Sequence, residues 1–205
     1  MKRKKAKKRS IYKFRLFVLI IIFLFFGSYS TNFKWEISTF AFSFNKIFEI
    51  FRPQSIKFQD TDVKVYFSPN GGCRKAIITE IDNAHKSIIV AMYYFTNREI
   101  AQSIIRAKNR GVSIKILLDE SQTKEKFSKY RFLIKNGIRV QIDRRTGLMH
   151  NKFAVIDDLV LITGSYNWTS SAEHRNRENL LIIKNEKLAQ RYIWEFNKLW
   201  AKSSP

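Results

Sequence analysis

The stretch HNKFAVIDDLVLITGSYNWTSSAEHRNREN, residues 150–179, decides the fold that we expect. Lys152, Ala154 and Ile156 alternate with Phe153, Val155 and Asp157 as on the two faces of a strand, Asp157-Asp158 is typical of a turn, and 159–163 is a second apolar run. This pattern predicts a β-hairpin. The end of the return strand should therefore come near the residues that begin the first strand.

The residues at that end of the hairpin suit phosphodiester chemistry. His150, Lys152 and Asp157 stand in the spacing H-x-K-x(4)-D, and the run Gly164-Ser165-Tyr166-Asn167 follows them. Because alternate side chains of a strand share a face, His150 and Lys152 should point the same way. An imidazole can act as nucleophile or proton carrier, and a lysine with neutral donors can hold phosphate oxygens. The stretch predicts a phosphoryl-transfer site.

At these residues the chain resembles the phospholipase D superfamily, in which H-x-K-x(4)-D is followed by G-S-x-x-N; here the asparagine comes one residue earlier, as Gly164-Ser165-Tyr166-Asn167. It has one copy of the motif, as in the small endonuclease branch and in the mitochondrial cardiolipin hydrolase and Zucchini branch, whereas classical phospholipases D carry two. The resemblance covers residues 60–205. The fixed series of His, Lys, Asp, Gly-Ser, Asn and Glu-Asn makes it specific.

Carried over residue by residue, the resemblance implies a catalytic role for His150, which would attack phosphorus and form a covalent phosphohistidine. It implies that Lys152, Ser165 and Asn167 bind the phosphate oxygens. It further implies that Glu178 accepts a hydrogen bond from the other ring nitrogen of His150 and so fixes its tautomer.

Asp157 completes the set of catalytic motif residues, but we expect a supporting or turn role for it, because an aspartate facing a phosphate would repel it. The spacing alone leaves open a Mg²⁺ site at Asp157-Asp158, although Lys152 already supplies the positive charge that a metal would contribute. Three histidines and one cysteine without close spacing argue against zinc. We predict no metal and no cofactor.

The resemblance also implies a homodimer with a shared active site. In-line displacement needs a nucleophile on one side of phosphorus and an acid on the leaving-group side, and one imidazole cannot easily serve both. Since the chain has one motif histidine, two chains would meet along a two-fold axis and each give its motif residues to one site. The alternative is that His85 or His174 acts as the acid within a monomer.

The net charge of +21 is distributed unevenly along the chain. Residues 1–15 hold nine Lys or Arg and no acid, whereas residues 60–205 hold 25 bases and 15 acids, a net charge of +10. A basic domain raises the local concentration of a polyanion. The arginines that we place at the rim of the site are Arg144, Arg145, Arg175 and Arg177.

Residues 1–30 predict a targeting segment. A basic stretch over 2–9 precedes eleven unbroken apolar residues, 16–26, and Ser28-Tyr29-Ser30 offers small residues to a signal peptidase. A cleaved signal peptide and an uncleaved membrane anchor both fit this segment. In either case we expect the catalytic domain on the periplasmic or extracytoplasmic side of the cell membrane.

Residues 31–59 predict an aromatic amphipathic linker or helix. Both a helix packed on protein and an interfacial membrane helix fit its apolar stripe. The stripe consists of Phe33, Ile37, Phe40, Phe44, Ile47 and Phe51.

From residue 60 onward, strand and helix patterns alternate. This alternation predicts one α/β domain over residues 60–205, a mixed β-sheet flanked by helices on both faces. Besides the hairpin, we expect strands at 63–67, 87–94, 112–118, 138–142 and 180–183, and helices at 73–86, 97–110, 121–136 and 185–201.

The sequence therefore predicts a metal-independent phosphodiesterase with two candidate substrate classes. A nuclease acting on DNA or RNA is slightly favoured by the basic domain and by the resemblance to the single-motif endonucleases. The alternative is a phospholipase D acting on phosphatidylcholine or cardiolipin, supported by the membrane-directed N-terminus and the aromatic stripe. A non-catalytic nucleic-acid or membrane-binding module ranks last, because every motif residue is present.

Overall fold

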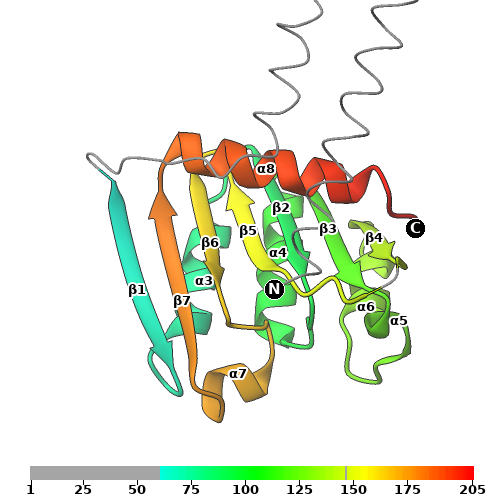
Figure 1. Cartoon of the computed structure of the whole chain (residues 1–205), viewed down its shortest axis with the longest axis horizontal. Helices are drawn as coiled ribbons and strands as arrows, with labels where there is room; N and C mark the ends of the chain where they lie inside the picture. Colours follow the sequence, from blue (N-terminus) through cyan, green and yellow to red (C-terminus); the bar gives the residue numbers. More distant parts are fainter. Residues whose placement is uncertain (1–60, 146) are drawn as a thin grey trace, which may run out of the picture. The chain divides into compact units, whose positions relative to one another are not determined.

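The structure, a computed structural model, describes residues 61–145 and 147–205. In this part of the chain, strands and helices alternate as predicted (Figure 1). The strands are β1 (Asp62–Ser68), β2 (Ser87–Met92), β3 (Ser113–Asp119), β4 (Arg139–Asp143), β5 (Lys152–Ile156), β6 (Val160–Gly164) and β7 (Glu178–Lys184). The helices are α3 (Cys73–Asp82), α4 (Arg98–Asn109), α5 (Ser121–Lys124), α6 (Tyr130–Lys135), α7 (Ser170–His174) and α8 (Glu186–Trp200).

All these strands join one sheet in the order β1-β7-β6-β5-β2-β3-β4. The strands β2, β3 and β4 run parallel, whereas β5 pairs antiparallel with β2, and the half formed by β5, β6, β7 and β1 is antiparallel throughout. The predicted hairpin is β5 and β6, and its turn places Asp157 and Asp158 at φ values of 52° and 59°. These positive values are what the commonest two-residue hairpin turn requires. The predicted mixed α/β sheet is confirmed.

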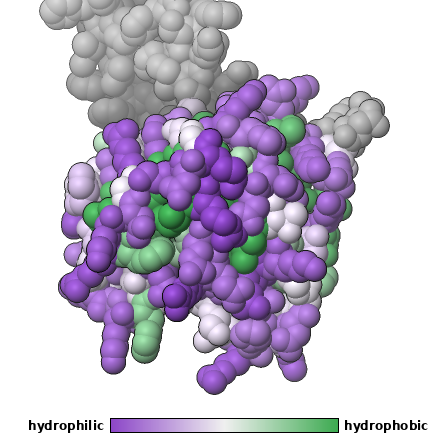
Figure 2. Space-filling view, turned by 180° about the vertical axis from the view of Figure 1, so that it is seen from behind, coloured by the Kyte–Doolittle hydropathy of each residue, from purple (hydrophilic) through white to green (hydrophobic). Residues whose placement is uncertain are grey.

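Helices cover both faces of the sheet, as predicted. The helices α3 and α4 pack on one face and α8 crosses the other (Figure 1). Because helices cover both faces, the central strands are apolar on both sides. Strand β2, for example, buries Val90 against α3 and α4, and Ala91 on the side of α8. The outer surface seen from behind, where α3 and α4 lie, is mostly hydrophilic, as expected of surface helices (Figure 2).

Three elements differ from the prediction. Helix α3 ends at Asp82 and not at residue 86, because the backbone N–H groups of residues 85–87 turn toward the carboxylate of Asp157. The stretch 121–136 divides into two short helices, α5 and α6. Helix α7 was not predicted; the side chain of Thr169 begins it by accepting a hydrogen bond from the backbone N–H of Ala172 at 3.0 Å.

The predicted targeting segment, residues 1–30, and the aromatic stripe of residues 31–59 lie outside the described residues, so both stay predictions. Within residues 61–145 and 147–205, no helix is long and apolar enough to cross a membrane.

Candidate active site

The two halves of the motif meet at one edge of the sheet, the lower edge in Figure 1. Lys152 begins β5, Gly164 ends β6 and Glu178 begins β7. Since β6 runs antiparallel to both neighbours, its end lies beside the beginnings of β5 and β7. Strand β2 ends at the same edge, with Met92 opposite Lys152. The structure thus brings the motif residues together as the hairpin pattern predicted, while their chemical roles stay predictions.

Gly164 allows β6 and β7 to approach closely at this edge. Its φ of 148° is unusual for a residue with a side chain. A Cβ atom added there would lie 2.2 Å from the carbonyl oxygen of Asn179, well inside van der Waals contact. The same carbonyl accepts the backbone N–H of Ser165 at 3.1 Å. Glycine is therefore required for Ser165 to stand where it does.

His150 and Lys152 share one aromatic neighbour, Tyr93. The imidazole of His150 contacts the Tyr93 ring with 4.6 Å between centroids and 58° between planes. The Nζ atom of Lys152 lies 5.0 Å from the centroid of that ring and donates to the carbonyl oxygen of His150 at 2.9 Å. Burial lowers the pKa of Lys152 by disfavouring the ammonium form, and the negative charge of Glu178 partly offsets this.

Ser165 and Glu178 face each other across the β6–β7 edge. The hydroxyl of Ser165 donates to Oε2 of Glu178 at 2.5 Å, and the amide of Asn176 donates to Oε1 at 3.0 Å. Both carboxylate oxygens of Glu178 are therefore engaged. Among the described residues, no hydrogen bond joins Glu178 to the ring of His150, so the orienting role carried over for Glu178 stays a prediction.

The side chain of Asn167 accepts one hydrogen bond through its oxygen, and its NH₂ group has no partner among the described residues. Its Oδ1 accepts the backbone N–H of Tyr94 at 3.2 Å, which leaves the side-chain NH₂ free to donate to a phosphate oxygen. The next residue, Trp168, is fully buried and anchors this turn, because its carbonyl accepts the backbone N–H groups of Thr96 and Asn97, each at 2.9 Å. The predicted phosphate-binding role of Asn167 is compatible with this geometry.

Asp157 follows the end of β5 that is remote from His150, and the five residues of β5 between them span about 16 Å at roughly 3.3 Å per residue. Its carboxylate accepts the backbone N–H groups of His85, Lys86 and Ser87 at 2.9, 2.7 and 2.9 Å. Burial alone would raise the pKa of Asp157, but these three donors outweigh it and lower the pKa below its usual value. The structure gives this motif residue the turn role that we expected, far from the phosphate-binding end.

The predicted rim arginines before the motif already have partners. Arg144 donates to the hydroxyl of Ser204 at 2.5 Å and to the carbonyl of Pro205 at 3.1 Å. Arg145 forms an ion pair with Asp143 at 2.6 Å, and its hydrogen bonds, which outweigh burial, hold the pKa of that carboxyl below its usual range. Both arginines nevertheless line a groove of about 610 Å³ beside His150. The other lining residues are Asp143, Gly147, Leu148, Met149, Asn151 and Leu199.

The two arginines after the Gly-Ser turn, Arg175 and Arg177, are exposed in the segment between α7 and β7. Within the part of the chain that the structure describes, neither guanidinium has a side-chain partner. Arg177 precedes Glu178 directly in the chain, and Arg175 stands three residues before it.

The two other histidines occupy different places. His85 belongs to the segment bound by Asp157, at the far end of β5, which excludes it as the acid of a monomeric site. His174 ends α7, is exposed, and places its Nδ1 3.2 Å from Oδ1 of Asn70. Neither shares a contact with His150 among the described residues.

Two further residues support this site: Tyr93, which sequence reasoning missed, and Asp119, which the sequence favours as a cap or a surface charge. Asp119 is only 4% exposed. Its Oδ2 accepts the backbone N–H of Met149, the residue before His150, at 2.9 Å, and its Oδ1 accepts that of Ser121 at 3.0 Å. The available signal was position, since both Tyr93 and Asp119 follow or end parallel strands whose carboxyl ends lie at the motif edge.

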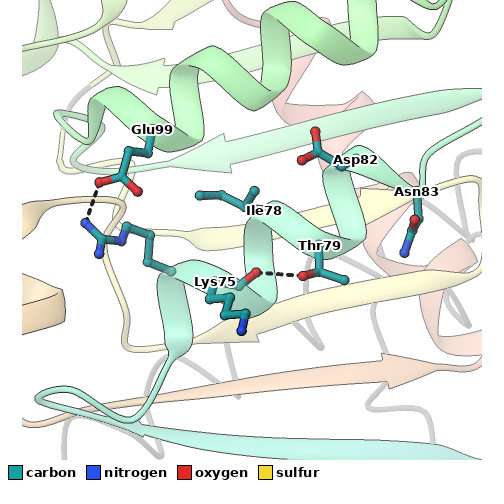
Figure 3. Close-up of a pocket in the computed structure, with 7 residues that line it drawn as sticks. Lys75, Ile78, Thr79, Asp82, Asn83 and Glu99 are labelled. Carbon is teal, nitrogen blue, oxygen red and sulfur yellow. Dashed lines mark hydrogen bonds and ion pairs between the residues drawn. The ribbon is translucent and has the colours of Figure 1, made fainter.

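A second hollow, of about 540 Å³, lies between α3 and α4 (Figure 3). Its lining mixes both charges, and Arg74 and Glu99 form an ion pair at 2.6 Å. No motif residue reaches it, so we place the site at the sheet edge. Among residues 61–145 and 147–205, no group of three or more His, Cys, Asp or Glu could hold a metal ion; metal independence itself stays a prediction.

Comparison with known proteins identifies the family. Residues 77–200 match the family described as "Cardiolipin synthase, PLD-like domain". The chain belongs to this family, the phospholipase D superfamily, and is a phosphodiester hydrolase. It is 36% identical to a phospholipase D of Rickettsia bellii over 94% of each chain. It is also 43% identical to a phospholipase D of Rickettsia conorii, over 64% of this chain and 66% of the relative's length.

Relatives that carry other names support the same family assignment, and so do solved structures. A mitochondrial cardiolipin hydrolase of Canis lupus familiaris is 31% identical over 67% of this chain and 58% of its own length. The crystal structure of Nuc, a phospholipase D family member from Salmonella typhimurium, superposes with a TM-score of 0.67 at 32% identity, covering 70% of this chain and 97% of Nuc. NucT of Helicobacter pylori, at 24% identity and a TM-score of 0.65, shares the fold.

Proposed function

We propose that this protein is a phospholipase D that hydrolyses the headgroup ester of a membrane phospholipid. The similarity to the Rickettsia bellii phospholipase D carries this proposal, because it extends over 94% of both chains and so beyond the catalytic domain. The basic domain and the resemblance to the single-motif endonucleases slightly favoured a nuclease. The named relatives, phospholipases D and cardiolipin hydrolases, favour the lipid alternative instead.

The proposed chemistry uses the residues at the sheet edge. The lone pair of the His150 imidazole attacks phosphorus, the bond from phosphorus to the headgroup oxygen breaks, and that oxygen takes a proton from a second imidazolium. Water then attacks the phosphohistidine, the phosphorus–nitrogen bond breaks, and the proton of the water returns to the second imidazole. Phosphatidic acid and the free alcohol result. Lys152 and the free amide of Asn167 hold the non-bridging oxygens.

The second imidazole comes from a second copy of the chain in this proposal. The described histidines other than His150 lie elsewhere, His85 at the far end of β5 and His174 on α7. A symmetric homodimer would supply two copies of His150 to one site. If wild-type and His150→Ala subunits are mixed in equal amounts and exchange freely, roughly one quarter of the wild-type activity should remain. Retention of half would show independent sites and reject the shared one.

The substrate is tested by transfer to an alcohol. Full-length protein in detergent is mixed with vesicles of phosphatidylcholine or cardiolipin in the presence of ethanol, with His150→Ala as the matched control. Interception of the phosphohistidine should give a phosphatidyl ethanol with the wild type only. Phosphatidic acid without the ethanol product would contradict the covalent step, and no lipid product at all would reject the lipid substrate.

A nuclease remains the second candidate because of two observations. The described domain belongs to a segment with a net charge of +10, and Arg175 and Arg177 stand exposed beside Glu178. Both would favour a polyanion. The same preparation is therefore incubated with end-labelled DNA and RNA. Cleavage that His150→Ala abolishes, without any lipid product, would reverse the order of the two candidates.

We also propose that residues 1–30 direct export, so that the domain works on the extracytoplasmic side of the membrane. Alkaline phosphatase fused after Pro205 and expressed in a bacterium should be active, because it folds only where disulfides form. An inactive fusion that regains activity in an oxidising cytoplasm would place the domain inside the cell.

A further inference from the structure

We infer that Tyr93 is a positioning residue that sets the orientation of the His150 ring and the place of the Lys152 ammonium group. One aromatic ring touches both: the imidazole at 4.6 Å between centroids, and the Nζ atom at 5.0 Å from the centroid. An aromatic face attracts a cation within about 6 Å of its centroid, so the Tyr93 ring holds the ammonium group electrostatically as well as by packing. The inference rests on the nucleophilic role proposed for His150.

Tyr93 is itself held through its backbone and through one neighbouring ring. The backbone N–H of Tyr93 donates to the carbonyl of Asn151 at 2.9 Å, which ties the residue to the segment between His150 and Lys152. The ring of Tyr94 stands edge-on against it, with 4.7 Å between centroids. The N–H of Tyr94 is in turn bound by Asn167. A ring held in this way can fix the orientation of the His150 imidazole and the position of the Lys152 ammonium group.

The imidazole of His150 needs such a support. His150 is exposed, and among the described residues its ring makes no hydrogen bond, ion pair or ring contact other than the one with Tyr93. Glu178, the group expected to orient it, gives both carboxylate oxygens to Ser165 and Asn176. Before substrate binds, the Tyr93 ring is thus the contact that restricts rotation of the imidazole.

The phenol of Tyr93 is suited to a neutral supporting role. Burial raises its pKa, and the charges of Tyr94 and Asp119 raise it further. The ring therefore stays uncharged at neutral pH, and its hydroxyl has no partner among the described residues. The ring, and not the hydroxyl, is the part that the inference requires.

The test compares Tyr93→Leu with Tyr93→Phe in the full-length protein, with Tyr130→Leu as the matched control. Tyr130 is also a half-buried tyrosine, but it begins α6 and packs against the core, and it makes no hydrogen bond or ring contact with His150 or Lys152 among the described residues. Hydrolysis of bis(4-nitrophenyl) phosphate reports on phosphodiester chemistry whatever the natural substrate is. Misplacement of a nucleophile by about 1 Å can cost about 100-fold in rate, so Tyr93→Leu should lower kcat at least about tenfold and change KM less than about threefold.

Tyr93→Phe keeps the ring and should retain kcat within about threefold of the wild type, as should Tyr130→Leu. Equal losses in Tyr93→Leu and Tyr93→Phe would assign the effect to the hydroxyl and overturn the inference, as would an unaffected Tyr93→Leu. If His150→Ala kept its activity, the proposed nucleophile would fail instead, and the two failures are therefore distinguishable.

A measurement on the wild type covers the case in which Tyr93→Leu does not fold. The imidazole Cε1–H resonance of His150, assigned by its loss in His150→Ala, should be displaced by the ring current of Tyr93 from its position in an unfolded chain. The exposed His85, which has no aromatic contact among the described residues, provides the undisplaced reference. Coincident His150 and His85 resonances would show that the imidazole does not rest on the ring.

Discussion

Replacing Asp157 by Asn should lower the stability of the protein without removing its activity. The carboxylate of Asp157 accepts three backbone N–H groups, from His85, Lys86 and Ser87, at the end of β5 remote from His150. Asparagine keeps the shape and tolerates the left-handed backbone that Asp157 adopts at φ 52°. The substitution therefore removes charge and acceptor strength without adding backbone strain.

The size of the effect follows from those three hydrogen bonds. A net contribution of about 1 kcal/mol each, somewhat more for a charged acceptor, would give about 3 kcal/mol in total. His85 and Lys86 are exposed, so water replaces part of the loss, and we expect about 2 kcal/mol. For a domain of this size, such a loss should lower Tm by roughly 6 °C.

Thermal unfolding as a function of pH separates the charge from the packing. The three donors keep the pKa of folded Asp157 below its value in the unfolded chain, which is about 3.9. The stabilisation is therefore present above about pH 5 and is lost as the pH falls through the lowered pKa. The Tm values of the wild type and of Asp157→Asn should converge once the pH falls below the lowered pKa of folded Asp157.

Asp158→Asn is the control for Asp157→Asn, because Asp158 occupies the same turn, at φ 59°, and its exposed carboxylate has no partner among the described residues. Its Tm should change by less than about 1 °C. The reasoning would be refuted if Asp157→Asn kept the wild-type Tm, or if it lost kcat at 25 °C while fully folded, since the latter would make Asp157 a catalytic residue.

Three further predictions concern the site. Hydrolysis should continue in excess EDTA, because Lys152 and the neutral donors neutralise and hold the phosphate; activity lost to EDTA and restored by Mg²⁺ or Zn²⁺ would contradict this. Glu178→Gln should lower kcat more than it raises KM, measured by steady-state kinetics, because a neutral amide cannot stabilise the imidazolium of His150; an unchanged kcat would assign that task to another group. Asp119→Ala should cost about 2 kcal/mol in denaturant unfolding and also lower kcat, because it frees the N–H of Met149 next to the nucleophile; full activity at reduced stability would limit Asp119 to a structural role.

The sequence predicted the sheet and the meeting of the motif halves because both depend on local pattern. Two short apolar runs, 153–156 and 159–162, separated by Asp157-Asp158 predicted a hairpin, and a hairpin brings its two ends together whatever surrounds it. The helices at 97–110 and 185–201 were equally recoverable, because Asn97 and Asn185 cap them through their own side chains, at 3.0 and 2.9 Å.

The features that sequence reasoning missed depend on contacts between distant residues. Helix α3 ends early because Asp157, more than 70 residues away in the chain, captures the following backbone. From the sequence alone, Tyr93 resembles any other apolar residue of a strand. The pairing of β2 with β5 brings its ring into contact with the ring of His150. Asp119 likewise reads as an exposed cap until the loop before His150 covers it. Hydrophobic periodicity indicates local secondary structure and does not predict contacts between residues that are distant in the chain.

The bond between Ser165 and Glu178 links the two tasks that the family resemblance assigns to these residues. Ser165 has a single hydroxyl hydrogen, and in the structure it points to Oε2 of Glu178 at 2.5 Å. To donate to a phosphate oxygen, Ser165 must turn this hydrogen away, which leaves Oε2 without that donor. A carboxylate at the site edge that has lost one donor gains from another, and the N–H of the His150 imidazole is of the right kind. Phosphate binding by Ser165 would therefore break an existing bond, and the lone pair of Oε2 that this frees becomes available to the N–H of the His150 imidazole.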